Sequence, residues 1–124
     1  MENKTKILIV DDYLPLLEML NESLVNSGYD VVYTNDGAEA TNIFTTFNPD
    51  IVLTDIVMPG VDGIELILDL RKINASIKVV AMSGGNSGRA DTYLNMAKKL
   101  GANKIIPKPF KVSELLKQLD SLVA

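Results

Sequence analysis

The chain has 124 residues, the length of a single domain with a hydrophobic core of its own, and its formal net charge is −4. The acidic net charge, without a basic stripe, argues against a nucleic-acid or membrane-surface partner. No apolar segment approaches the ~18 residues of a membrane span, and the N-terminus is unlike a signal peptide. The absence of cysteine is consistent with a cytoplasmic protein. Cysteine and histidine are both absent, which excludes disulfides, thiol chemistry, Ser-His-Asp catalysis and imidazole metal ligands.

Strands and helices alternate along the first part of the chain. A β-branched apolar run before Asp11-Asp12 predicts a strand buried on both faces, and apolar residues at helical spacing follow it. Ser27-Gly28 is a typical end for that helix, because glycine readily adopts the left-handed conformation of a helix C-cap. The expected elements are a strand at 6–10, a helix over about 14–24, a strand at 29–34, a turn at 35–37 and a helix at 38–47.

The segment 51–63 is the centre of the predicted fold. An apolar run starting at Ile51 reads as a buried strand that ends at Asp55, and the breakers Pro59, Gly60 and Gly63 precede a third helical pattern. In open parallel sheets, ligands bind outside the carboxyl ends of the strands, which is where Asp55 falls. The alternative is an aspartate that only bonds the amides of its own turn.

The second half of the chain repeats the alternation. The expected elements are a strand at 77–82, a glycine-rich loop at 83–88, a helix at about 91–100, a short strand at 104–106, the segment Pro107-Lys108-Pro109-Phe110 and a helix at about 112–123. Five strands that alternate with five helices predict right-handed crossovers and a parallel sheet covered on both faces.

We therefore expect one domain, residues 1–124, with an α/β fold of the doubly wound, flavodoxin-like type. The first and third strands are the most apolar, so they should be central, and a strand order of 2-1-3-4-5 places them side by side. Asp11, Asp12 and Asp55 would then converge at one rim of the sheet.

Three crowded carboxylates repel one another unless a cation or a proton relieves them. Capping of the first helix is an alternative role for Asp11 and Asp12, but with Asp55 beside them a Mg²⁺ site explains all three. Ser83 and Lys108 follow strands that end at the same rim, and their hydroxyl and ammonium could hold phosphoryl oxygens together with loop amides at 57 and 84. The predicted chemistry is phosphoryl transfer onto Asp55 as the nucleophile.

These residues, in this order, resemble bacterial response-regulator receiver domains over essentially the whole chain. The resemblance implies that Asp55 accepts a phosphoryl group from a histidine kinase or phosphotransfer protein. It implies that Asp12, Asp55 and the Val57 carbonyl bind Mg²⁺ directly, that Asp11 does so through water, and that Ser83 and Lys108 contact the phosphoryl group. It also implies a cis Lys108-Pro109 peptide bond.

Two departures from the family pattern affect the expected behaviour. Ile105 stands where receivers usually carry Tyr or Phe, and Val57 and Gly85 lack the polar side chains that could orient an attacking water, which suggests a long-lived phosphoryl state. The response is therefore expected in the loop 83–88 and the fourth helix, and the surface of helix four, strand five and helix five is expected to bind a downstream target protein or effector domain.

Two other classes of function compete with a phosphorylation switch. A hydrolase of the haloacid-dehalogenase type would need a second acid two residues beyond the nucleophile, where Val57 stands. A phosphorylation-independent interaction module of the same fold would typically lack some of the five polar residues described above. The chain has no G-x-x-x-x-G-K loop, which argues against direct use of ATP.

Overall fold

The computed structural model describes residues 4–56, 63–84, 95, 98–99 and 101–123. The elements are β1 (Lys6–Val10), α1 (Leu14–Asn26), β2 (Asp30–Thr34), α2 (Gly37–Phe47), β3 (Ile51–Asp55), α3 (Gly63–Ile73), β4 (Lys78–Gly84), β5 (Lys104–Lys108) and α5 (Val112–Val123). From β1 to β4 the strands and helices alternate as the sequence predicts.

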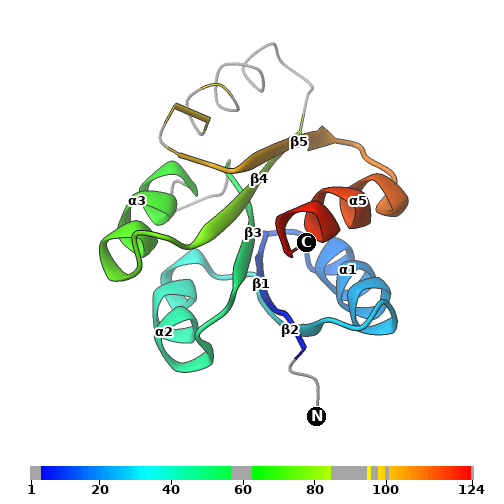
Figure 1. The fold of residues 1–124 in the computed structure, drawn as a ribbon, viewed down its shortest axis with the longest axis horizontal. Helices are drawn as coiled ribbons and strands as arrows, with labels where there is room; N and C mark the ends of the chain where they lie inside the picture. The colour runs from blue at the N-terminus through cyan, green and yellow to red at the C-terminus, as the bar shows by residue number, and fades with distance from the viewer. Residues whose placement is uncertain (1–3, 57–62, 85–94, 96–97, 100, 124) are drawn as a thin grey trace.

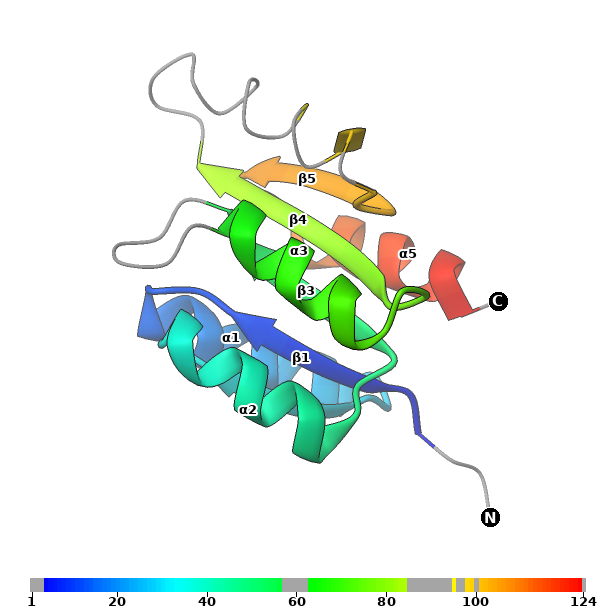
Figure 2. The same ribbon diagram turned by 90° about the vertical axis from the view of Figure 1, so that its left-hand side faces the viewer.

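The five strands form one parallel sheet in the order β2-β1-β3-β4-β5. Helices α2 and α3 cover one face and α1 and α5 cover the other, as Figure 1 and the turned view in Figure 2 show. The predicted doubly wound α/β fold and its strand order are confirmed. Because all strands run the same way, their carboxyl ends share one rim, and residues that follow different strands meet there.

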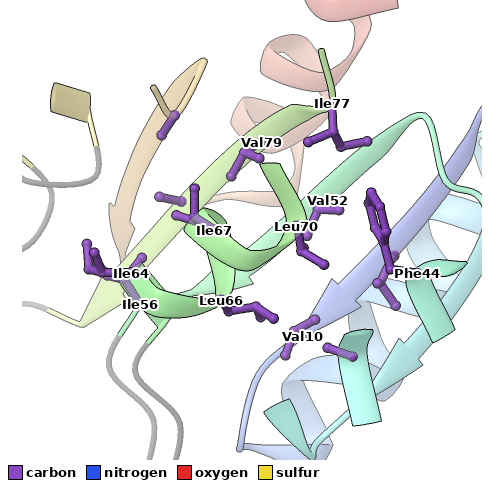
Figure 3. Packing of buried hydrophobic residues seen from close by; sticks show 14 residues of the cluster. Val10, Phe44, Val52, Ile56, Ile64, Leu66, Ile67, Leu70, Ile77 and Val79 are labelled. Carbon is purple, nitrogen blue, oxygen red and sulfur yellow. The ribbon is translucent and has the colours of Figure 1, made fainter. Parts of the chain in front are cut away.

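The alternation of side chains along the strands divides the core into two clusters. Val10 and Val52 pack with residues of α2 and α3, such as Phe44 and Leu70 (Figure 3). Ile9, Leu53 and their strand neighbours pack on the opposite face with residues of α1 and α5. The side chains of Ile7 through Val10 are fully buried, as expected for a central strand covered on both faces.

The ends of β4 and β5 differ from the sequence prediction. Ser83 and Gly84, expected in a loop, belong to β4 and pair with Pro107 and Lys108, which extend β5 beyond its predicted end. A proline is tolerated there because β5 is an edge strand, where a missing N–H group leaves no neighbouring strand unpaired.

The start of the second helix also differs. Gly37, expected in a turn, is the first residue of α2, and the Asp36 side chain caps this helix by accepting a hydrogen bond from the Ala38 amide.

Several predictions concern residues outside the described ranges. Asn95, Lys98 and Lys99 are helical, but the rest of the predicted fourth helix, Val57 and Gly85 lie outside them. Within the described part of the chain, no helix is both long and apolar enough to cross a membrane.

Candidate functional site

Three carboxylates meet at the carboxyl rim of the sheet, as the sequence predicts. Asp11 and Asp12 follow β1, Asp55 ends β3, and one carboxylate oxygen from each lies within 4.8 Å of the others. Asp11 is fully buried and Asp55 is 5% exposed, whereas Asp12 is exposed to solvent. Two of the three charges are therefore held away from water, where their mutual repulsion is screened least.

Both carboxylate oxygens of Asp11 already have partners. Oδ1 accepts a hydrogen bond from the Tyr13 amide at 2.9 Å, and Oδ2 accepts one from the Lys108 ammonium at 2.5 Å. The N-cap of α1 is Tyr13, and no side chain caps this helix. Helix capping, the alternative role considered for Asp11 and Asp12, is therefore wrong.

Among the described residues, Lys108 is the only one whose ammonium lies beside these carboxylates. Its Nζ atom lies 2.5 Å from Asp11 Oδ2 and 3.6 Å from Asp55 Oδ2, and its side chain is 21% exposed. The Lys108-Pro109 peptide bond is cis, as the family resemblance implied. Three carboxylates and one ammonium leave an excess of two negative charges, which matches a divalent cation.

Ser83 completes the set that the sequence singles out. Its side chain is fully buried, and its hydroxyl has no hydrogen-bond partner among the described residues. A buried hydroxyl without a partner costs free energy, so it is more readily explained by a ligand or a second conformation than by packing. It lies on β4, which is paired with β3 at the end that carries Asp55.

Two residues next to Asp55 have contacts that the sequence prediction did not include. Thr54 is fully buried and donates its hydroxyl to the Asp55 carbonyl at 2.9 Å. Gly63, which we treated only as a helix breaker, begins α3 directly against the backbone of Asp55 and Ile56. The only sequence signal for Thr54 was a single hydroxyl in an otherwise apolar strand.

The donor set fits a hard cation such as Mg²⁺. Carboxylate oxygens are its preferred protein ligands, and the partly solvated Asp12 leaves room for the waters that Mg²⁺ retains. The predicted fourth oxygen, the Val57 carbonyl, lies outside the described residues.

With this geometry established, the comparisons with known proteins identify the family. A family model described as "Response regulator receiver domain" matches residues 7–120. The chain is 37% identical over 110 residues to sporulation initiation phosphotransferase F of Bacillus subtilis (strain 168), covering 89% of this chain and 86% of that protein. The chain therefore belongs to the response regulator receiver domain family.

Solved structures agree. A chemotaxis response regulator of Vibrio cholerae superposes with a TM-score of 0.84 at 26% identity, covering 97% of this chain and 99% of that one. The receiver domain of a Francisella response regulator gives a TM-score of 0.85 at 29% identity and 96% coverage of both chains. The chain is thus a phospho-accepting switch of phosphorelay signalling rather than an enzyme in the usual sense.

Proposed function

We propose that Asp55 is the phosphoacceptor of this receiver and that a histidine kinase or phosphotransfer protein donates the phosphoryl group. The observation that carries the proposal is the position of the Asp55 carboxylate, which is buried, 3.6 Å from the Lys108 ammonium and within 4.8 Å of two other carboxylates. A structural role would not require such crowding of like charges.

The transfer itself needs positioning and charge compensation rather than a base. An oxygen of the Asp55 carboxylate forms a bond to phosphorus while the bond from phosphorus to the donor's leaving group breaks, and the leaving group keeps the electron pair. Lys108 is close enough to follow the added negative charge, because its ammonium already contacts Asp11 and lies near Asp55. The free hydroxyl of Ser83 is a suitable hydrogen-bond donor to a phosphoryl oxygen.

Mg²⁺ is part of the proposal. Asp12, Asp55 and the Val57 carbonyl would bind it directly, and Asp11 would bind it through water. The engagement of both Asp11 oxygens by Tyr13 and Lys108 supports this division, because the exposed Asp12 has more freedom to meet a cation. When bound, Mg²⁺ supplies positive charge that offsets the carboxylates and the incoming phosphoryl oxygens.

The partners follow from the same class of function. The similarity to a Bacillus phosphotransferase supports a phosphotransfer protein or kinase as the donor, and we place the switch in the cytoplasm as one receiver domain over residues 1–124. A downstream protein or effector domain would bind the surface of the fourth helix, β5 and α5. Ile105, on β5, packs against the core cluster on the α2 and α3 side, and its side chain is not aromatic. We therefore expect the response in residues 83–88 and the fourth helix rather than through an aromatic switch.

The test is intact mass after incubation with Mg²⁺ and acetyl phosphate. Wild type should gain one phosphoryl group and Asp55→Asn none. Asp50→Asn is the matched control, because Asp50 is an exposed carboxylate at the opposite rim of the sheet and should leave the mass gain unchanged. A phosphorylated Asp55→Asn variant, or an unmodified wild type, would refute the assignment.

A further inference from the structure

The peptide group that joins Asp55 to Ile56 is held from several directions at once. Its carbonyl accepts the Thr54 hydroxyl at 2.9 Å, and its N–H group donates to the Met82 carbonyl of β4 at 3.0 Å. The start of α3, at Gly63, lies against the same peptide. This peptide is bonded directly to the Cα atom that carries the Asp55 carboxylate, so its orientation sets the direction of that side chain.

Thr54 acts from the face of the sheet opposite to the carboxylate. Alternation along β3 places Thr54 with Val52, on the side of α2 and α3, and Asp55 with Leu53, on the side of α1 and α5. A fully buried threonine among apolar side chains loses its hydration, and its hydroxyl offsets this loss by bonding the Asp55 carbonyl. Valine has the same shape and would fill the same space, so packing alone does not require the hydroxyl.

Gly63 makes the close approach of α3 possible. A Cβ atom on Gly63 would lie 2.4 Å from the Asp55 carbonyl oxygen, 2.4 Å from Ile56 Cα and 3.0 Å from the Ile56 carbonyl carbon. All three are backbone atoms, so a side chain could be accommodated only by moving the peptide or the helix. Figure 3 shows Ile56 beside Ile64 at this end of α3, where the core cluster fixes both.

We propose that Thr54 and Gly63 are positioning residues for phosphorylation, which hold the Asp55–Ile56 peptide and so aim the Asp55 carboxylate at the phosphoryl group. This inference rests on the proposed role of Asp55. Neither residue touches the phosphoryl group. Loss of either contact lets the carboxylate rotate away from its reactive orientation and lowers the rate of transfer.

Thr54→Val and Thr54→Ser form the decisive pair, because the first keeps the shape without the hydroxyl and the second keeps the hydroxyl. The measurement is the rate constant of phosphorylation by acetyl phosphate at saturating Mg²⁺, followed by intact mass at a temperature where every variant is folded. Since small misplacements of reacting groups are costly, Thr54→Val should slow the reaction about fivefold to tenfold. Thr54→Ser should stay within about twofold of wild type, because it restores the same donor.

The control is Thr46→Val, which removes a hydroxyl-to-carbonyl hydrogen bond from α2, away from the rim. It should keep the wild-type rate. If Thr54→Val is folded and reacts at the wild-type rate, or if Thr54→Ser is as slow as Thr54→Val, the positioning role is wrong while Asp55 remains the acceptor. If wild type itself is not phosphorylated, the proposed function fails and this inference fails with it.

Gly63→Ala tests the second contact independently. Alanine is the better helix former, so a substitution without a clash would leave the helix at least as stable. We expect instead that the amide resonances of Asp55 and Ile56 shift and that the rate falls at least as far as in Thr54→Val. A folded Gly63→Ala protein with wild-type resonances and rate would overturn the role of Gly63. If this variant does not fold, the contact is too tight for a Cβ atom, and the Thr54 pair decides.

Discussion

Aspartate and lysine side chains lie at both rims of the sheet, but most of them are buried or half-buried at one rim and exposed at the other. At the carboxyl rim, Asp11 and Asp55 are buried, and Lys108 lies between them. At the amino rim, Asp50 is exposed and exchanges hydrogen bonds of 2.8 Å with the Lys6 backbone through its own amide and side chain. Carboxylates are present at both rims, but only the carboxyl rim crowds them together away from water.

The amino rim also contains a cavity. Its volume is about 550 Å³, and polar side chains that are mostly exposed line it, among them Lys4, Asn74 and Lys78. Lys78 donates to the Leu122 carbonyl, near the end of α5, so this ammonium stabilises a helix end. The charged side chains that line this cavity, Lys4, Asp50 and Lys78, are all exposed. Burial and convergence of charges therefore distinguish the carboxyl rim from the amino rim, and they mark it as the candidate site.

The largest expected effect on stability is the loss of the Lys108 ammonium, compared with the loss of the Lys78 ammonium at the other rim. Lys108→Ala leaves the fully buried Asp11 carboxylate without its ammonium, which should lower the free energy of unfolding of the metal-free protein by about 2–3 kcal/mol. Lys78→Ala removes an exposed bond to a carbonyl that water can replace, so it should cost less than about 1 kcal/mol. Urea unfolding of both variants in EDTA measures the difference. Equal losses would show that the Lys108 ion pair contributes no more than a surface contact.

A stabilisation of about the same size is expected from Mg²⁺ at saturating concentration. A cation that binds only the folded protein should stabilise it by about 2.7 kcal/mol when its concentration is a hundred times the dissociation constant. Asp12→Ala should abolish the resulting rise in melting temperature, and the amino-rim control Asp50→Asn should preserve it. Lys108→Ala should bind Mg²⁺ as well as wild type or slightly better, because a competing cation is removed. A melting temperature that does not respond to millimolar Mg²⁺ would contradict the metal site.

The sequence predicted the strands and helices whose apolar pattern lies within a single element. The apolar runs of β1 and β3 match the observed strands to the residue, because burial of both faces of a strand determines them. The amphipathic repeat of α5 matches the observed helix, because burial of one helical face determines it. The extension of β4 through Ser83 and Gly84 was missed because serine and glycine are loop-like in composition. Only their pairing with Pro107 and Lys108, across the sheet, makes them a strand.

The site likewise contains features that the sequence predicts and features that it does not. The convergence of Asp11, Asp55 and Lys108 could be predicted, since it needs only the strand order and the strand ends. The choice of Asp11 as the nearer partner of Lys108 could not, because it joins residues 97 positions apart through side-chain geometry. Likewise, nothing local shows that Gly63 meets the Asp55 backbone, because the contact depends on how closely α3 approaches β3.

The smallest predicted effect concerns the amino rim, where Tyr29 precedes β2 and donates its hydroxyl to Asp120 of α5. Burial raises the pKa of Tyr29 well above its usual value, and the hydrogen bond and charge of Asp120 raise it further. The pKa of Tyr29 is higher in the folded protein than in the unfolded chain, where it is about 10. The hydrogen bond therefore stabilises the fold fully below about pH 10, and this stabilisation is lost as the pH rises beyond that value. Tyr29→Phe should therefore lower the free energy of unfolding by about 1 kcal/mol at neutral pH. Above pH 10 the free energy of unfolding of wild type should fall toward that of the variant, by at most about 1.4 kcal/mol per pH unit. Urea unfolding of both proteins from pH 8 to 11 checks this, since other groups titrate alike in both. A gap that stays constant with pH would mean that Tyr29 ionises as readily in the folded protein as in the unfolded chain.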